Sequence, residues 1–152
     1  MGSGPGQWTD YLRRQGIDVE GVEPTDAFVE DARRRYPAAR YRTGRAESLE
    51  VEGASIGGVL AWFSLIHTEP DDLPRAFAEF ARCLAPGGSV LIGFFDGAAR
   101  EPFDHAVTTA YYWSVEALAG LLDRAGLAAT DSHTRADSGV RPQGRIVASR
   151  ID

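Results

Sequence analysis

The apolar run SVLIGFF at residues 89–95 constrains the fold of this chain more than any other stretch. A run that is apolar at both odd and even positions is typical of a strand buried on both faces of a sheet. The preceding segment, residues 69–88, predicts an amphipathic helix that the turn Pro86-Gly87-Gly88 is expected to end. The apolar face of that helix is predicted to carry Leu73, Phe77, Phe80 and Leu84. A helix that leads into a fully buried strand favours an α/β fold.

The other segments repeat this alternation of helix and strand. Helices are predicted within residues 7–16, 25–37 and 114–127, and strands within residues 17–24, 39–44, 56–62, 128–133 and 145–149. Such alternation is typical of a layered α/β fold with a mostly parallel sheet. A loop without a helix joins the last two strands, so the final strand is expected to run antiparallel to its neighbours.

Length and charge narrow the class of protein. A chain of 152 residues is expected to form one domain, residues 1–152. Its net charge of −6 argues against a general nucleic-acid binder, which usually carries a basic face. No apolar run is long enough to span a bilayer and no signal peptide precedes the fold, so a cytoplasmic location and no membrane partner are expected.

Several residue types are absent or sparse, which excludes some chemistry. The chain contains no lysine, which removes Schiff-base catalysis, the P-loop lysine and the Tyr-x-x-x-Lys pair of many nicotinamide reductases. The three histidines and the one cysteine are too scattered along the chain to suggest a zinc site, so no metal is expected. Cys83 is interpreted as core filler beside the apolar stripe of its helix.

The first residues and Glu23 together predict a nucleotide site. Gly2, Gly4 and Gly6 alternate in a loop of the kind that lets backbone approach a nucleotide. Glu23 ends a predicted strand about 20 residues beyond the first glycine, the separation at which an acidic residue meets ribose hydroxyls. A carboxylate suits this task because it accepts the hydrogens of two hydroxyl groups at once.

The stretches GSGPGQWTDYL, VEGVEP, GRAESL, AWFSLIH and LAPGGSVLIGFF resemble the class I S-adenosylmethionine-dependent methyltransferases, most closely the small-molecule type 11/12 methyltransferase domain. The resemblance implies a Rossmann-like sheet of strand order 3-2-1-4-5-7-6 with strand seven antiparallel. The family's first strand would precede Gly2, so the chain is expected to lack that strand and the N-terminal helix before it. A misassigned start codon is the favoured explanation, beside truncation and closure by dimerisation.

The same resemblance implies the cofactor-binding residues for S-adenosylmethionine and its product S-adenosylhomocysteine. Gly2, Ser3 and Gly4 would lie against the methionine part, Glu23 would bind the ribose, and Pro24 would lie beside the adenine. The full implied set is Gly2, Ser3, Gly4, Gly6, Glu23, Pro24, Ala46, Glu47, Phe63, Ser64 and His67. Arg45 stands where the family usually has an aspartate that contacts the adenine amino group, so adenine recognition is expected from backbone or Glu47.

Few residues are needed for methyl transfer, because a sulfonium methyl group is already activated and alignment supplies much of the acceleration. Acceptors of high pKa also need a base, and His67 or His105 is predicted for that role. Other roles stay open for both residues. His67 could instead contact the cofactor or stand at the start of a helix. The aromatic segment around His105 could either form a wall of the substrate pocket or only pack on the sheet. The Asn/Asp-Pro-Pro-Tyr pattern of amide-nitrogen methyltransferases is absent, which favours a small-molecule acceptor.

Two rival functions remain at this point. An NAD(P)-dependent oxidoreductase would need glycine at the sixth position of the loop, where Gln7 stands. A non-catalytic truncated binding module would keep the fold without methyl transfer. A homodimer is a further expectation, since an unpaired strand edge invites pairing with a second chain.

Overall fold

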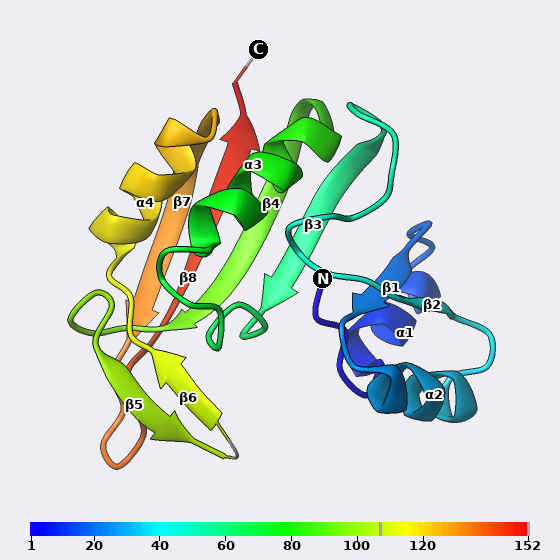
Figure 1. The fold of residues 1–152 in the computed structure, drawn as a ribbon, viewed down its shortest axis with the longest axis horizontal. Helices are drawn as coiled ribbons and strands as arrows, with labels where there is room; N and C mark the ends of the chain where they lie inside the picture. Colours follow the sequence, from blue (N-terminus) through cyan, green and yellow to red (C-terminus); the bar gives the residue numbers. More distant parts are fainter. Residues whose placement is uncertain (107, 152) are drawn as a thin grey trace. The chain divides into compact units, whose positions relative to one another are not determined.

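The computed structural model describes residues 1–106 and 108–151, and in these residues the chain forms two compact units, residues 1–50 and 51–151. Unit 1 contains α1 (Gln7–Arg14), β1 (Glu20–Glu23), α2 (Asp26–Arg35) and β2 (Arg40–Thr43) (Figure 1). Unit 2 contains β3 (Ile56–Trp62), α3 (Leu73–Cys83), β4 (Leu84–Phe95), β5 (Pro102–His105), β6 (Thr108–Tyr111), α4 (Val115–Arg124), β7 (Leu127–Arg135) and β8 (Gln143–Arg150). Among the described helices, none combines the length and hydropathy needed to cross a bilayer.

Unit 1 is a parallel β1–α2–β2 arrangement preceded by α1. The two strands pair in register, with Gly21 opposite Tyr41 and Glu23 opposite Thr43. Val29 and Ala32 of α2 pack on Tyr41 of β2 and form the buried cluster of this unit. Because parallel strands end at the same edge of a sheet, this register places Glu23 beside the turn that follows β2.

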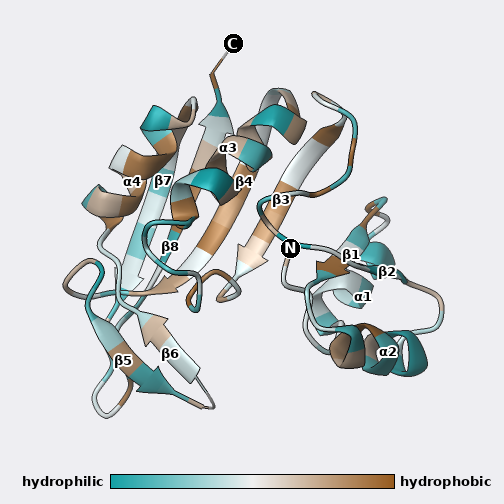
Figure 2. Ribbon diagram, in the orientation of Figure 1, coloured by the Kyte–Doolittle hydropathy of each residue, from teal (hydrophilic) through white to brown (hydrophobic). Residues whose placement is uncertain are grey.

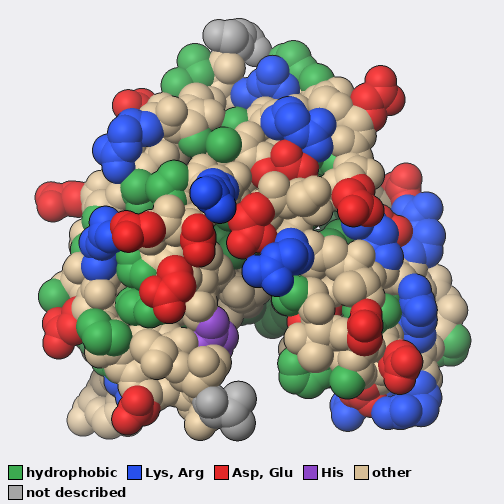
Figure 3. Space-filling view, viewed as in Figure 1, with side chains coloured by type: hydrophobic (Ala, Val, Ile, Leu, Met, Phe, Trp, Pro, Cys, Tyr) green, Lys and Arg blue, Asp and Glu red, His purple; other side chains and the backbone are tan. Residues whose placement is uncertain are grey.

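Charged side chains of unit 1 pair with one another at its surface. Arg34 and Arg35 both bind Asp31 within α2, and Arg13 and Arg14 both bind Asp10 within α1. Figure 3 shows acidic and basic side chains interspersed over the molecular surface. The last turn of α2 is basic, and its positive charge is favourable at the negative end of the helix dipole.

Unit 2 is built on a sheet of strand order β3-β4-β8-β7. β3 and β4 are parallel, while β8 is antiparallel to both β4 and β7, so β8 alone runs against the other described strands of this sheet. Figure 1 shows α3 and α4 side by side over the sheet. These pairings confirm the α/β fold with an antiparallel final strand.

The core of unit 2 lies between α3, α4 and the sheet. Leu73, Phe77 and Phe80 are buried on α3 as predicted for its apolar face, and Cys83 is buried with them. Leu84 is buried too, but it belongs to β4. Hydrophobic residues follow one another along much of β4 (Figure 2). Burial of such side chains stabilises a fold by about 1.5–3 kcal/mol each.

The boundary between α3 and β4 differs from the prediction. The helix ends at Cys83, and Leu84 already has an extended backbone and pairs with Ile56 of β3, so the turn Pro86-Gly87-Gly88 lies inside the strand. Two effects account for this: a residue before proline disfavours helical geometry, and pairing with β3 extends the strand backward. The register shift between Ile56 and Gly58 accommodates the irregular turn.

The β5–β6 hairpin was not predicted from the sequence. Its strands pair antiparallel, with Phe103 opposite Ala110 and His105 opposite Thr108. Most of its residues are exposed or half-buried, so its sequence lacks the apolar alternation that identifies strands. Phe103 is a partly buried member of the cluster around Phe95 and Ala110, which attaches the hairpin to the end of β4.

The pairing of the described strands agrees with the strand order 3-2-1-4-5-7-6 that the family resemblance implies, except that strand one has no counterpart among them. The pair β2-β1 corresponds to strands 3-2, and β3-β4-β8-β7 corresponds to strands 4-5-7-6. Within the described residues, β1 pairs with β2 alone and β3 with β4 alone. In the implied order, these are the two strands that flank strand one.

Candidate functional site

The glycine loop, residues 2–6, folds back onto the carboxyl end of β1. The amides of Gly2 and Ser3 donate to the carbonyl of Val22 at 2.7 and 3.1 Å. Gly2, Gly4 and Gly6 have φ angles of 65°, 51° and 93°, in the left-handed region that residues with a Cβ rarely adopt. The alternating glycines are therefore required by the path of the loop.

Gly6 is also required by close packing. A Cβ at this position would lie 2.6 Å from the Tyr41 hydroxyl and 2.9 Å from the Cβ of Ala32. The Tyr41 hydroxyl donates to the Gly6 carbonyl at 2.9 Å. Burial, helped by the negative charge of Asp10, raises the pKa of Tyr41 to about 12, so this hydroxyl keeps its proton at neutral pH. One tyrosine of β2 thus fixes the end of the loop where α1 begins.

Glu23 holds the loop from the other side. Its side chain is buried, its Oε2 accepts the Gly4 amide at 2.9 Å and its Oε1 accepts the Thr25 amide at 3.1 Å. A carboxylate offers about four acceptor positions, so each oxygen keeps one for a hydroxyl donor. Burial lowers the pKa of the nearby Met1 amino group to about 6, against the opposing effect of Glu23, so this amine is mostly neutral at pH 7.

The turn after β2 lies next to Glu23. The Gly44 amide donates to the Glu23 carbonyl at 3.1 Å, and Ala46 is buried behind it. Arg45 is 75% exposed and reaches Glu47 at 3.6 Å. Arg45 is thus directed to solvent and to the carboxylate of Glu47.

Phe63 and Ser64 follow β3 in unit 2. Phe63 has a strained backbone, and Ser64 has a buried hydroxyl without a partner among the described residues. Phe63 has a φ of 51°, which for a bulky side chain costs roughly 1–3 kcal/mol and is typical of functional sites. Its ring lies against Gly93 of β4, where a Cβ would come within 3.0 Å of it. The Ser64 hydroxyl oxygen is buried and has no hydrogen-bond partner among the described residues.

Ser3 of the glycine loop shares this property. Its hydroxyl oxygen is buried and unpartnered in the described part of the chain. Leaving a buried hydroxyl unbonded costs roughly 1–3 kcal/mol, and proteins rarely accept that cost without a reason such as a ligand. Both serines belong to the residue set that the sequence predicts for the cofactor. Each unit therefore contains a buried hydroxyl that a polar ligand could satisfy.

His67 has a defined tautomer. Its Nδ1 lies 2.8 Å from the carbonyl oxygen of Thr109, and a carbonyl can only accept. The neutral ring therefore carries its proton on Nδ1 and presents Nε2 as a lone-pair acceptor. Because the side chain is exposed, that lone pair is accessible to a donor in solution.

His105 of β5 lies beside His67, with ring centroids 5.2 Å apart. Its ring also packs against Phe95 and Phe103, and its Nδ1 is buried without a partner in the described residues. Burial lowers the pKa of His105, and the electrostatic interactions of its protonated ring with His67 and Arg141 lower it further. The structure thus brings together the two predicted candidate bases. No group of three or more His, Cys, Asp or Glu in the described residues is placed to hold a metal ion.

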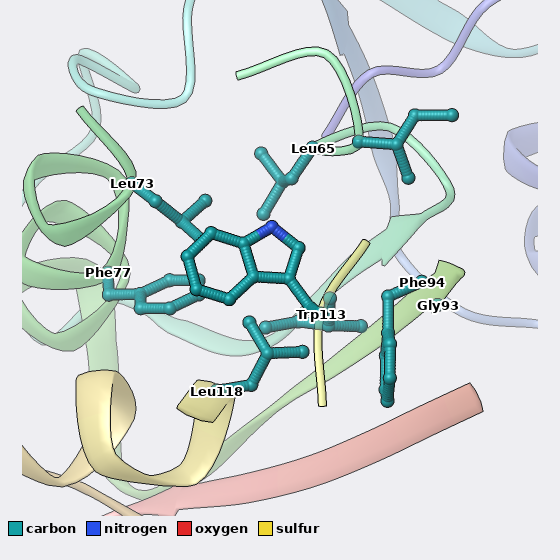
Figure 4. Close-up of a pocket in the computed structure, with 9 residues that line it drawn as sticks. Leu65, Leu73, Phe77, Gly93, Phe94, Trp113 and Leu118 are labelled. Carbon is teal, nitrogen blue, oxygen red and sulfur yellow. The ribbon is translucent and has the colours of Figure 1, made fainter. Parts of the chain in front are cut away.

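A small apolar cavity lies in the core of unit 2. Figure 4 shows the indole of Trp113 between Leu73 and Phe77 of α3, Leu118 of α4 and the chain around Leu65. Its volume is about 10 Å³, the space of a single water molecule. The buried indole nitrogen of Trp113 has no partner among the described residues, and a water there would accept from it. This cavity is too small for a methyl acceptor.

Two groups at the histidine pair were not found from the sequence. The Thr109 carbonyl fixes the His67 tautomer, and Arg141 lies over the Phe103 ring at 4.3 Å from its centroid. A backbone carbonyl has no sequence signature. Arg141 lies in a loop containing glycine and proline, where no periodicity indicates which way a side chain is directed.

Comparison with known proteins identifies the family. The model of the family described as "Methyltransferase domain" matches residues 1–88, which is more than half of the chain. The chain therefore belongs to the methyltransferase-domain family, and its fold is that of the class I S-adenosylmethionine-dependent methyltransferases.

Curated relatives and a solved structure agree with this assignment. An uncharacterized methyltransferase of Mycobacterium tuberculosis is 33% identical over 91 residues, covering 58% of this chain and 35% of the relative. The malonyl-[acyl-carrier protein] O-methyltransferase of Pectobacterium atrosepticum is 29% identical over 101 residues, covering 66% of this chain and 39% of the relative. The chain thus spans about a third to two fifths of these relatives.

The structural similarity extends over nearly the whole chain. The 1,6-didemethyltoxoflavin-N1-methyltransferase of Burkholderia thailandensis, solved with bound 1,6-didemethyltoxoflavin and S-adenosylhomocysteine, has a TM-score of 0.84 at 23% identity. The match covers 99% of this chain and 69% of that structure. At this identity the match defines the shared fold.

Proposed function

We propose that this chain binds S-adenosylmethionine and transfers its methyl group to a small-molecule acceptor. The observation that carries the proposal is the glycine loop joined to Glu23 by the hydrogen bond from the Gly4 amide to Oε2. This contact places the loop backbone beside a buried carboxylate whose oxygens keep acceptor capacity, the combination that a ribose diol requires. The family membership supports the same cofactor.

In unit 1, the proposed cofactor contacts are local. Glu23 accepts the ribose hydroxyls, Pro24 lies beside the adenine, and the backbone of Ala46 with the Glu47 carboxylate meets the adenine edge. The glycine loop, residues 2–6, contacts the methionine part through Gly2, Ser3, Gly4 and Gly6. The unpartnered Ser3 hydroxyl supports this assignment, since a bound cofactor would supply its missing partner.

In unit 2, we propose cofactor contacts from Phe63, Ser64 and His67. The cofactor supplies an activated methyl group when it is bound, so the protein needs mainly to align the acceptor. The strained backbone at Phe63 and the unpartnered Ser64 hydroxyl support a ligand-binding role for the end of β3.

We assign the role of general base to His67. Its Nε2 accepts the proton of the acceptor's hydroxyl or amine group, while the Nδ1 proton stays bonded to the Thr109 carbonyl. His105 is the second candidate. Its lowered pKa keeps it neutral at physiological pH, but its buried Nδ1 leaves it one ring nitrogen for proton exchange.

Calorimetric titration tests the cofactor. The purified chain is titrated with S-adenosylmethionine, S-adenosylhomocysteine and NADH, beside Glu23→Gln and the control Glu30→Gln, an exposed residue of the same unit. We expect binding of the first two, a loss of about tenfold or more in Glu23→Gln, and no change in Glu30→Gln. Binding of NADH alone would establish the oxidoreductase alternative, and a folded chain that binds neither would establish a non-catalytic module.

A pH profile tests the base. With an acceptor in hand, His67→Gln should lower kcat by about 10²–10⁴ and change the pH profile of the reaction. His133→Gln, at an exposed position of β7, is the matched control. An unchanged profile in His67→Gln would move the assignment to His105.

The proposed setting follows from the same features. We propose a small molecule rather than a nucleic acid as acceptor, because the chain is acidic and pairs most of its arginines with carboxylates. Cytoplasmic location and a homodimer stay predictions. Sedimentation velocity of the chain with and without S-adenosylmethionine tests the dimer.

A further inference from the structure

Arg141 is held in place by neutral groups. Its guanidinium carbon lies 4.3 Å from the centroid of the Phe103 ring and 5.9 Å from that of Tyr112. One terminal nitrogen donates to the Tyr112 hydroxyl and the other to the Asp104 carbonyl at 3.4 Å. These contacts come from β5 and the residue after β6, so the β5–β6 hairpin positions the cation.

The charge of Arg141 is not neutralised by a carboxylate. Arg145 pairs with Asp131, Arg100 pairs with Asp71, and most other arginines have similar partners. Throughout residues 1–106 and 108–151, no carboxylate oxygen lies within 4 Å of the Arg141 guanidinium. A guanidinium has five N–H donors and the contacts above occupy two of them, so three remain available on an exposed side chain.

The surroundings of Arg141 favour an anion. The ring of Phe103 contacts both the Arg141 guanidinium and the His105 ring, and His67 lies beside His105. Glu69 accepts the Tyr111 hydroxyl at 2.7 Å, and Asp104 meets Arg141 through its backbone carbonyl. A guanidinium that has no carboxylate partner among the described residues attracts negative charge.

We propose that Arg141 binds a carboxylate group of the methyl acceptor and positions that molecule beside His67. This inference rests on the proposed function, because Arg141 contacts a substrate only if the chain is a methyltransferase. A guanidinium fork matches a carboxylate or a phosphate in two parallel hydrogen bonds. A single arginine balances the single charge of a carboxylate, whereas a phosphate dianion would keep an unbalanced charge. The acceptor class is therefore a carboxylate-bearing small molecule with a hydroxyl or amine to methylate.

Histidine NMR tests the inference without turnover. The chain has three histidines, so their ring C–H signals are resolved in one spectrum, and His133 on β7 serves as an internal control. Acetate, malonate and benzoate are titrated at constant ionic strength, with benzamide as the uncharged counterpart of benzoate. We expect saturable shifts of His67 and His105 with at least one carboxylate, no shift with benzamide and no shift of His133.

Variants assign the effect to Arg141. Arg141→Gln should weaken carboxylate binding about tenfold or more, and Arg141→Lys should fall between it and the parent chain because charge is kept without the fork. Arg75→Gln, an exposed residue of α3, is the matched control and should bind as the parent does. An unchanged His133 signal shows that each variant is folded.

The outcomes separate the two proposals. Equal responses to benzoate and benzamide, no saturable response to any carboxylate, or unchanged affinity in Arg141→Gln would each overturn the carboxylate site. Tighter binding of phenyl phosphate than of benzoate would replace the carboxylate by a phosphate and overturn the proposed acceptor class. Titration of the same samples with S-adenosylhomocysteine reports on the cofactor site separately, so failure of the proposed function is read from a different signal.

Discussion

The two units hold their candidate site residues in opposite ways. In unit 1, both oxygens of Glu23 accept backbone amides and the glycine loop is bonded to β1, so most of the site groups have protein partners. In unit 2, the Ser64 hydroxyl and the His105 Nδ1 are buried without partners in the described residues, and Phe63 has a strained backbone. Apart from the unpartnered Ser3 hydroxyl, unit 1 thus uses its site residues to hold its fold, whereas unit 2 maintains its site residues at a cost in stability.

This difference has a physical origin in core size. The buried cluster of unit 1 is built on Val29, Ala32 and Tyr41, so the loop and Glu23 contribute a large part of its local order. Unit 2 buries a row of large side chains, including Phe77, Phe80 and Phe94. A core of that size can compensate for an unsatisfied hydroxyl at the end of β3, since each such defect costs only roughly 1–3 kcal/mol.

The largest effect is expected from Gly6→Ala in unit 1. The new methyl group would lie 2.6 Å from the Tyr41 hydroxyl at a φ of 93°, so overpacking and backbone strain add. We expect a loss of about 2–5 kcal/mol in the free energy of unfolding. Gly4→Ala is the control for strain alone, because no atom lies within 4 Å of its added Cβ, and it should cost about 1–2 kcal/mol. Urea denaturation followed by circular dichroism measures both, and equal losses would contradict the packing role of Gly6.

Glu23→Gln should come next. The amide nitrogen of glutamine would face one of the two backbone amides that now donate to the carboxylate, those of Gly4 and Thr25. We expect a loss of about 1–3 kcal/mol in stability, in addition to weaker cofactor binding. Hydrogen exchange of residues 2–6 measures the local effect. If exchange stays slow while cofactor affinity falls, Glu23 serves cofactor binding alone and does not hold the fold of unit 1.

Ser64→Ala should give the opposite result in unit 2. Removing a buried hydroxyl that has no partner relieves a cost, so the free energy of unfolding should stay constant or rise by up to about 1 kcal/mol, while affinity for S-adenosylmethionine falls. Ser89→Ala removes a hydroxyl bonded to Ser149 at 3.0 Å and should lower stability by about 0.5–1.5 kcal/mol. Thermal denaturation and calorimetry distinguish the two. A destabilised Ser64→Ala would show that its hydroxyl has a structural role.

The smallest effect concerns pH. Burial, His67 and Arg141 lower the pKa of His105 below its ordinary value of 6.5, so between these two pKa values the unfolded chain binds more protons than the folded chain. Stability from this residue is therefore complete above pH 6.5 and is lost as the pH falls through the lowered value. His105→Phe should flatten the stability profile below pH 6.5, and His133→Gln should not. A parent profile that falls as the pH rises toward 6.5 would reverse the sign of this contribution.

Sequence periodicity identified most elements because they are amphipathic or fully apolar. Spacing predicted a helix within residues 69–88 and a strand over residues 89–95, and the structure has a helix over Leu73–Cys83 and a strand over Leu84–Phe95. The β5–β6 hairpin was missed because its residues alternate weakly in polarity, and its position depends on the packing of Phe103 at the end of β4. The early end of α3 was missed because the pairing of Leu84 with Ile56 is a non-local interaction.

The sequence by itself determined the α/β fold, the glycine loop and the place of Glu23, because these depend on residue spacing within one βαβ segment. Only the tertiary structure brought His67, His105 and Arg141 to one place, since they lie on a strand-end loop, a hairpin and the β7–β8 connection. Contacts between distant segments are set by how apolar surfaces pack. The spacing of residues along one segment carries no record of that packing.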